Sequence, residues 1–360
     1  MRISSIFKKN DFILCDVPVP IGYPQSQTHA GISYVPSKLN GYSYWLVSSP
    51  FPNKKPNRLI IIIKKALKSI LLKNISIKTK NNNNKVTGED YENPMLYFAN
   101  ETEKGEPPIK FIPFRDNPLM DKPKDIYGGG TYCSDPDIFI ENSDVYILNR
   151  ETFRRYYFKE KNQYSSYTRI NLLHGKVVDS EFKIINIDTK FTEIDLAGSP
   201  CIINFNDKYH YIYLITNSYN DGKDIGKLVI RSDNTIEGRF ESKKIARVDG
   251  GNFIPWHLSV FQHNGTLYSV VACIIKGNKR RCYQMLGEFD NNLDTLKIYQ
   301  IPLTNLNSYR GSAFVREDGE FILYSTTVFE KFTGSKSIDG REIIVAHKKF
   351  DLILKELQNK

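Results

Sequence analysis

The sequence predicts an all-β fold, a β-propeller with five or six blades, and three observations lead to it. A pattern of two aromatic-rich strands joined by a turn recurs six times along the chain. Four copies carry explicit hairpin dipeptides, which are Asn40-Gly41, Asn206-Asp207, Asn264-Gly265 and Asp318-Gly319. The 360 residues include 22 Tyr and 21 Phe, which favour pleated, half-buried surfaces.

The six copies of the motif cover most of the chain, at residues 28–49, 91–101, 133–150, 197–217, 255–273 and 309–326. The longer stretches between them are typical of the irregular outer strands of propeller blades, whereas a sandwich would space its strands more evenly. We therefore expect residues 1–360 to form one domain. A five-bladed closure results if the sixth motif or the strand FILCDVPV near the N-terminus completes a shared blade. The C-terminal EIIVAHKKFDLIL supplies closing strands for either blade count.

One segment, residues 54–88, falls outside the blade pattern and is strongly basic. Residues 54–85 hold nine Lys and one Arg with no Asp or Glu, which accounts for most of the net charge of +10. Its apolar residues recur at helical spacing opposite a lysine face, so residues 56–75 are a candidate for peripheral contact with an anionic membrane. A helix packed on the propeller rim and a β-hairpin are the alternatives. We find no helical period elsewhere.

The rest of the composition narrows the class of protein. Outside the insert the chain is close to neutral, which argues against a nucleic-acid groove. Five cysteines without a CxxC pair favour buried free thiols over a zinc finger or a disulfide scaffold. The N-terminus lacks the features of a signal peptide, and no apolar run is long enough to span a membrane. We expect a cytoplasmic protein, peripheral to the membrane if the insert binds it.

Aligning the motifs identifies the residues expected at the propeller axis, because the first strand of each blade lines the central channel. The aligned positions are all polar, and they are His29, Asn93, Asp135, Ser199, His257 and Arg310. The residues just before them include Glu92, Trp256 and Tyr309. We predict the functional site where these positions converge.

The order of the motifs resembles that of uncharacterised glycosidase- or sialidase-like propellers from phage and bacterial polysaccharide loci. The likeness covers about residues 28–328 and includes NGYSYWLVSSPFPN, YENP, SDPD, VYILNR, WH, YR and FILYS. More distantly the chain resembles the five-bladed glycosidases and fructosyltransferases of families 43 and 32. That resemblance implies three axial carboxylates, and Asp135-Pro136 matches the middle one. His29-Ala30 and Gly198-Ser199-Pro200 stand where those families carry Asp and Glu, so their mechanism does not transfer whole.

The axial residues suggest chemistry at a sugar anomeric centre. Asp135 is the candidate nucleophile or base, Glu92 the candidate acid, and Asp137 a substitute for either. The alternatives are a turn cap for Asp135 and a partner of the inserted lysines for Glu92. His29 and His257 are candidate acid–base groups. The set of His29, Asp135 and His257 lacks the short sequence spacing that is usual among metal ligands, so we predict no metal site.

The remaining candidates are assigned to substrate binding. Arg310 suits a carboxylate or phosphate, which suggests an anionic sugar or a nucleotide-linked donor, with a salt bridge to Asp135 or Glu92 as the alternative. Trp256 and Tyr309 would stack on a sugar ring or fill the space between blades. Asn93, Ser199 and Asp137 complete the predicted binding set.

Three functions from different classes follow. The first is a glycosyltransferase that builds a bacterial surface polysaccharide at the cytoplasmic membrane face, with no cofactor other than a nucleotide-activated sugar as donor substrate. The second is a glycoside hydrolase or depolymerase, which the resemblance favours. The third is a glycan-binding propeller without catalysis, which the missing carboxylates permit. The sequence places the transferase narrowly first.

Overall fold

The structure is a computed structural model that describes residues 4–23, 26–51, 92–124, 131–158, 163–194, 197–205, 208–216, 226–276, 278–328 and 341–359. The basic segment 54–88 lies outside the described residues, so its helix and its membrane contact stay predictions. The turn dipeptide Asn206-Asp207 lies outside them as well. No helix among the described residues is long and apolar enough to cross a bilayer.

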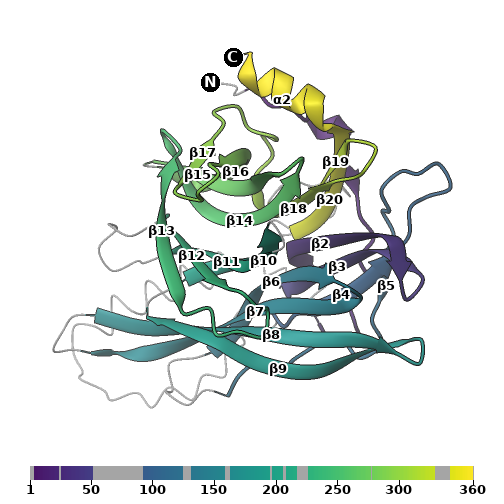
Figure 1. Cartoon of the computed structure of the whole chain (residues 1–360), viewed down its shortest axis with the longest axis vertical. Coiled ribbons are helices and arrows are strands. Elements are labelled where there is room, and N and C mark those ends of the chain that lie inside the picture. The colour runs from purple at the N-terminus through teal and green to yellow at the C-terminus, as the bar shows by residue number, and fades with distance from the viewer. Residues whose placement is uncertain are drawn as a thin grey trace, which may run out of the picture.

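The described strands form five antiparallel blades around one axis, which confirms the predicted propeller (Figure 1). The first blade comprises β2 (Ser26–Leu39), β3 (Tyr42–Phe51), β4 (Met95–Ala99) and β5 (Ile112–Pro113). The second comprises β6 (Thr131–Glu141), β7 (Asp144–Phe158), β8 (Gln163–Val178) and β9 (Glu181–Ile194).

The third blade comprises β10 (Ala197–Phe205), β11 (Tyr209–Thr216), β12 (Leu228–Asp233) and β13 (Ser242–Asp249). The fourth comprises β14 (Phe253–His263), β15 (Thr266–Ile275), β16 (Asn278–Phe289) and β17 (Thr295–Ile298). Their outer strands, β13 and β17, pair in parallel and join the two blades into one eight-stranded sheet.

The fifth blade combines strands from both ends of the chain. It comprises β18 (Ser308–Val315), β19 (Glu320–Val328) and β20 (Arg341–Lys349), and β1 (Ile13–Leu14) completes it by pairing with β20. This is the closure expected from FILCDVPV. A short 3-10 helix, η1 (Lys9–Asp11), precedes β1, and α2 (Phe350–Gln358) follows β20.

Two sequence predictions need correction at this level. The motif at 91–101 is not a blade of its own, because Met95–Ala99 forms β4, the third strand of the first blade. The end of EIIVAHKKFDLIL is not a strand but helix α2, in which Phe350, Ile353 and Leu357 are buried. Their i, i+3, i+7 spacing is that of an amphipathic helix, and it follows directly on a strand, which hid the change of period.

The predicted hairpin turns hold the blades in register. Asn40 and Gly41 both have positive φ, at 51° and 81°, and so do Asn264 and Gly265, at 49° and 77°. Positive φ at both central residues is the type I′ geometry that matches the twist of the flanking strands. These turns fix which side chains of β2 and β14 reach the axis, because a slip by one residue would turn every side chain to the other face.

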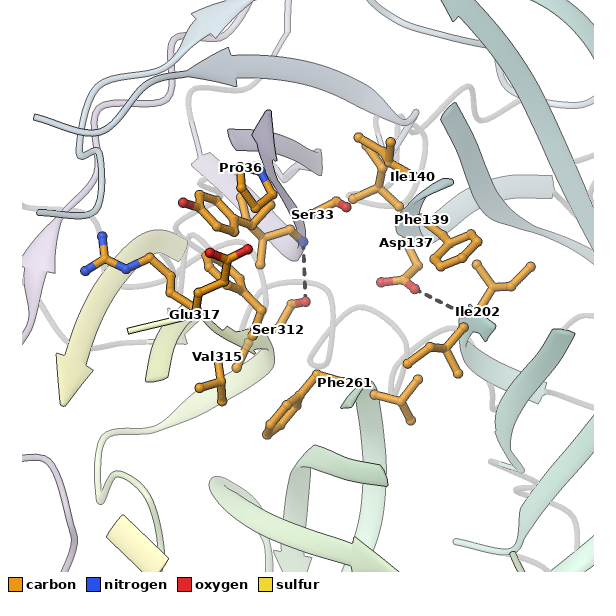
Figure 2. A pocket seen from close by; sticks show the side chains of 18 residues that line it. Ser33, Pro36, Asp137, Phe139, Ile140, Ile202, Phe261, Ser312, Val315 and Glu317 are labelled. Carbon is orange, nitrogen blue, oxygen red and sulfur yellow. Dashed lines mark hydrogen bonds between the residues drawn. The ribbon is translucent and has the colours of Figure 1, made fainter. Parts of the chain in front are cut away.

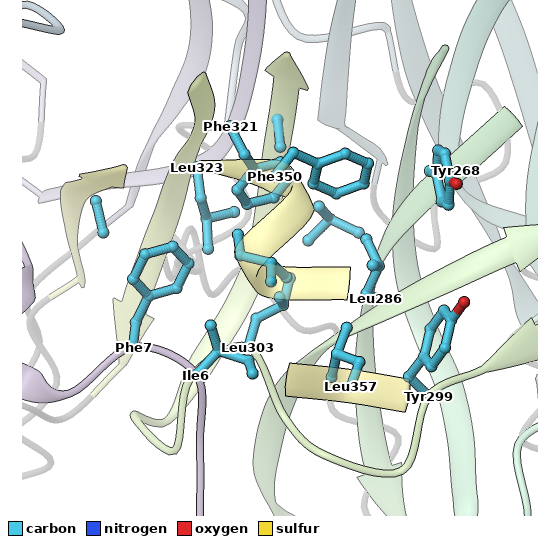
Figure 3. Close-up of a cluster of buried hydrophobic side chains, with 14 of the residues drawn as sticks. Ile6, Phe7, Tyr268, Leu286, Tyr299, Leu303, Phe321, Leu323, Phe350 and Leu357 are labelled. Carbon is cyan, nitrogen blue, oxygen red and sulfur yellow. The ribbon is translucent and has the colours of Figure 1, made fainter. Parts of the chain in front are cut away.

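The largest core cluster lies under the C-terminal helix, next to the N-terminal segment (Figure 3). Phe350 stacks on Phe321, with ring centroids 5.4 Å apart, and Phe7 also stacks on Phe321, at 6.4 Å. Ile353 and Leu357 join the same cluster. Because both chain ends contribute to it, this cluster secures the fifth blade.

The cysteines behave as the sequence predicts. All are free, and all are buried except Cys282, which is half-buried. Burial raises the pKa of Cys282 to about 11, so even the most accessible thiol stays protonated near neutral pH.

Candidate active site

A bulge near the start of each inner strand places one polar side chain at the axis. The pairing register shifts between Thr28 and Gly31 in β2, and corresponding shifts occur in β6, β10, β14 and β18. His29, Asp135 and Ser199 have positive φ at these bulges, at 58°, 51° and 52°. Proline follows Asp135 and Ser199, and a bulge tolerates it because no ladder hydrogen bond is needed there. Non-glycine residues with positive φ are costly and gather at functional sites.

Three of the predicted residues meet as one cluster, His29 from β2, Asp135 from β6 and His257 from β14. One ligand atom from each lies within 4.8 Å of the others. His29 Nε2 is 2.9 Å from Asp135 Oδ1, and His257 Nδ1 is 3.7 Å from the same oxygen. All three side chains are buried, so the cluster is a shielded polar centre at the axis.

Asp135 is held as a carboxylate by its other oxygen. Arg150 Nη2 lies 3.2 Å from Oδ2, and the backbone N–H of Ser199 donates to Oδ2 at 3.1 Å. Burial opposes ionisation, but the Arg150 guanidinium outweighs it and holds the pKa of Asp135 well below its usual range. Arg150 also donates from Nε to Ser134 Oγ at 2.9 Å. Asp135 therefore carries a permanent negative charge.

The two histidines are neutral imidazoles. Burial lowers the pKa of His29 to about 4, and burial lowers the pKa of His257 well below its ordinary value. Ser199 Oγ contacts His257 Nδ1 and orients that ring. Neutral imidazole is the form that binds a metal ion.

Glu92 stands beside the cluster, although not on an inner strand. Its Oε2 is 3.5 Å from His29 Nδ1, and the residue is buried. Asn93, also buried, follows it just before β4. The alignment with the axial motif was thus wrong about the strand, yet the third strand of the first blade still brings Glu92 to the predicted partners. The structure gives no contact between Asn93 and the cluster.

Tyr309 packs against both histidines of the cluster. Its ring centroid lies 5.2 Å from that of His29 and 4.3 Å from that of His257. Burial raises the pKa of Tyr309, so its phenol remains a neutral donor. Trp256 is half-buried, with its ring 6.3 Å from His257. Stacking of these two aromatic residues on a sugar ring stays a prediction.

Arg310 takes a different place from the one predicted. Its side chain is fully buried, and it donates to the carbonyl oxygens of Pro136 and Pro200 at 3.0 and 3.2 Å. It also donates to Asp137 Oδ1 at 3.3 Å, so its partner is neither Asp135 nor Glu92. These bonds tie β18 to β6 and β10 across the axis. The contacts favour a structural role over the predicted capture of an anion.

Asp137 lines a cavity of about 320 Å³, into which its carboxyl group points (Figure 2). Its Oδ2 accepts from the Ile202 backbone at 3.2 Å, and burial raises its pKa to about 6. Phe139, Ile202 and Phe261 line the cavity beyond it. Asp137 thus pairs with Arg310 beside a cavity that polar as well as apolar residues line, and its role as a substitute acid or base stays a prediction.

The cluster fits a divalent metal ion. His29 Nδ1 and His257 Nε2 are buried and make no hydrogen bond with the described residues, while His29 Nε2 faces Asp135 Oδ1 at 2.9 Å. Two neutral imidazoles and one carboxylate are a common ligand set for first-row divalent ions, leaving positions open for water or substrate. Short sequence spacing is not needed for such a set, because a propeller axis gathers side chains from blades that are far apart in sequence.

Two arginines near the cluster, Arg150 and Arg341, are not among the residues predicted from the sequence. Arg150 comes from β7, the second strand of its blade, and its only mark in the sequence is a charge two positions after the apolar run VYIL. Arg341 begins β20, and its guanidinium lies 4.4 Å from the centroid of Tyr309. An alignment of inner strands alone cannot find residues that reach the axis from second and third strands.

Comparison with known proteins gives relatives in structure only. No family model matches the chain, and no curated protein matches it. Among solved structures, an N-acetylgalactosamine deacetylase from F. plautii, in complex with blood group B trisaccharide, is 13% identical with a TM-score of 0.63, over 96% of each chain.

Two other solved structures are glycosidases. A family 43 β-xylosidase/α-arabinofuranosidase from a compost microbial metagenome, in complex with xylotriose, is 14% identical with a TM-score of 0.55, over 92% of this chain and 93% of that one. An α-L-arabinofuranosidase from Lactobacillus brevis is 9% identical with a TM-score of 0.52, over 89% and 90%. The predicted resemblance to family 43 is thus confirmed for the fold.

Proposed function

We propose that this protein is a metal-dependent hydrolase that removes an acyl group from a sugar residue of a glycan. The observation that carries the proposal is the buried convergence of His29, Asp135 and His257 at the axis. Further support comes from the deacetylase, whose fold matches this one over nearly its whole length.

The residues of the site divide the work of hydrolysing an amide or ester. His29, Asp135 and His257 would hold the metal ion, which when bound polarises the acyl carbonyl and makes water a better nucleophile. Glu92 is placed beside the ligands to accept a proton from the attacking water and pass it to the leaving amine or alcohol. Tyr309, a neutral phenol, can donate a hydrogen bond to the developing oxyanion. The products are the carboxylic acid and the deacylated sugar.

Hydrolysis accounts for the observations better than the glycosyl transfer placed first by the sequence. The solved structures described above are hydrolases by name. The transferase hypothesis rested on the basic insert, which lies outside the described residues, and on Arg310, whose donors face Pro136, Pro200 and Asp137. The cytoplasmic location stays a prediction.

Glycoside hydrolysis is the second candidate, favoured by the family 43 structures and by Asp135 at the position of their middle carboxylate. Hydrolysis of this kind uses two carboxylic groups on opposite sides of the bond. His29 and Ser199 replace the other two family carboxylates, and Arg150 keeps Asp135 from acting as an acid. Glu92 alone would remain, which is why we place this activity second.

One assay separates the candidates. The purified protein, stripped with EDTA and then reloaded with Zn²⁺ or Mn²⁺, is incubated with N- and O-acetylated oligosaccharides and with aryl xylosides and arabinosides. We expect metal-dependent release of acetate without cleavage of glycosidic bonds. In Glu92→Gln this release should fall roughly 100-fold or more while the metal stays bound.

The other outcomes decide against the proposal. Cleavage of glycosides that persists in EDTA would replace it with the glycosidase. Binding of oligosaccharide without release of acetate or of a sugar, under every metal condition, would leave a glycan-binding propeller.

A further inference from the structure

Arg341 is a cation positioned at the edge of the site. Its guanidinium lies 3.5 Å from the centroid of Phe51 and 4.4 Å from that of Tyr309, and Nη1 donates to Thr28 Oγ1 at 2.8 Å. Two aromatic rings and one hydroxyl thus hold the fork in place. Since β20 and β18 both pair antiparallel with β19, Arg341 enters from the end of the blade at which the axial bulges lie.

Tyr309 connects this arginine to the proposed catalytic cluster. The guanidinium of Arg341 lies over the phenol ring of Tyr309. The same ring packs against His29 and His257. A group bound by Arg341 would therefore lie one aromatic ring away from the reacting centre. In a glycan, the next substituent on the same sugar, or the next sugar residue, lies at about this separation from the reacting acyl group.

Among the described residues, Arg341 has no carboxylate partner at ion-pair distance. Arg150 and Arg310 are paired with Asp135 and Asp137, whereas no described carboxylate forms an ion pair with Arg341. Stacking on rings leaves the N–H edge of a guanidinium available, and that edge matches the two oxygens of a carboxylate or phosphate.

The space around Arg341 suits one acidic group and not a polyanion. Arg341 lines a cavity of about 400 Å³ with Gln27 and residues 14–19, a volume within the usual range for small-molecule sites. Asp16 and Glu342 line the same cavity. Their carboxyl groups would repel a densely charged chain, so a single oxyanion held by the Arg341 fork is favoured.

We propose that Arg341 is a specificity-determining residue that binds one oxyanion of an acidic glycan, a sugar carboxylate placed next to the residue that is deacylated. The proposal rests on the proposed function for the identity of the reacting residue. The anionic substrate that the sequence suggested through Arg310 is thereby retained, with Arg341 as its ligand. A sugar phosphate shares the chemistry and is distinguished in the test.

The test is calorimetric titration of the full-length protein with three probes. These are an N-acetylglucosamine–glucuronic acid disaccharide, its neutral methyl ester, and N-acetylglucosamine phosphate. We expect the acid to bind roughly 10- to 100-fold more tightly than the ester. Arg341→Met should remove that preference, and Arg341→Lys should restore only part of it, because an ammonium lacks the fork. Arg239→Met, which removes an exposed arginine, is the matched control and should keep the preference.

Each outcome decides the proposal. The proposal is overturned if the wild type binds the acid and the ester equally or binds neither of them. It is also overturned if Arg341→Met keeps the preference for the acid. Tighter binding of the phosphate than of the acid would mean that Arg341 recognises a sugar phosphate in place of a sugar carboxylate. A preference for the acid without any metal-dependent release of acetate would retain Arg341 as an anion ligand and reject the deacylation. Release of acetate without a preference for the acid would retain the deacylation and reject Arg341 as an anion ligand.

Discussion

Asp135 organises the candidate site because its two carboxylate oxygens serve different partners. Oδ1 faces His29 and His257, while Oδ2 receives Arg150 and the Ser199 backbone. Arg150 thereby compensates a charge that burial alone would not allow. Arg150 is therefore the residue on which the ionised state of Asp135 depends most.

Replacing Arg150 by Met should therefore destabilise the metal-free protein. The change leaves Asp135 buried without its cation, which costs about 3 kcal/mol of unfolding free energy. Urea denaturation in EDTA measures it. Arg115→Met removes an exposed ion pair with Glu181 in the neighbouring region and should leave the midpoint close to that of the wild type. Equal midpoints for both variants would contradict the account of Asp135.

The limits of sequence reasoning are clearest at single residues. His29, Asp135 and His257 could be found because a bulge recurs at the same point of each inner strand, where proline or a polar residue interrupts the alternation. Arg310 occupied the same position, yet its backbone acceptors could not be foreseen, because Pro136 and Pro200 belong to other blades. Glu92 was found through an alignment that assigned it to the wrong strand.

At the scale of elements, the ends of the chain close the propeller. β1 pairs with β20, and α2 then covers the core with Phe350 stacked on Phe321. Turn dipeptides and strand alternation predicted the blades well, because each blade is a local unit. They did not predict α2, whose few apolar positions continue the apolar run of β20. They also left the count at five or six blades, because the choice depends on which strand β4 pairs with.

Helix α2 offers a direct test of this closure. Phe350→Ala should lower the unfolding free energy by about 3–5 kcal/mol, because it empties a fully buried site between stacked rings. Leu352→Ala on the same helix is the control, since this side chain is 51% exposed, and its effect should stay within about 0.5 kcal/mol. Guanidinium denaturation compares the two. Equal losses would mean that α2 does not pack on the propeller core as described.

At the scale of the whole molecule, the propeller brings together groups that are more than two hundred residues apart in sequence. His29 and His257 meet across the axis from the first and fourth blades, and Asp135 joins them from the second. The same architecture pairs Arg310 with Asp137 and sets Arg341 at the edge. A fold of independent blades therefore makes one site, whose chemistry depends on the residue that each blade contributes.

The central claim is that this convergence is a metal site, and metal content measures it most directly. After equilibration with Zn²⁺ and gel filtration, plasma mass spectrometry should find about one ion per wild-type chain, and about one in Glu92→Gln, since Glu92 is not among the ligands. His257→Ala should retain almost none. A wild-type chain without bound ion, or a His257→Ala variant that keeps it, would contradict the account.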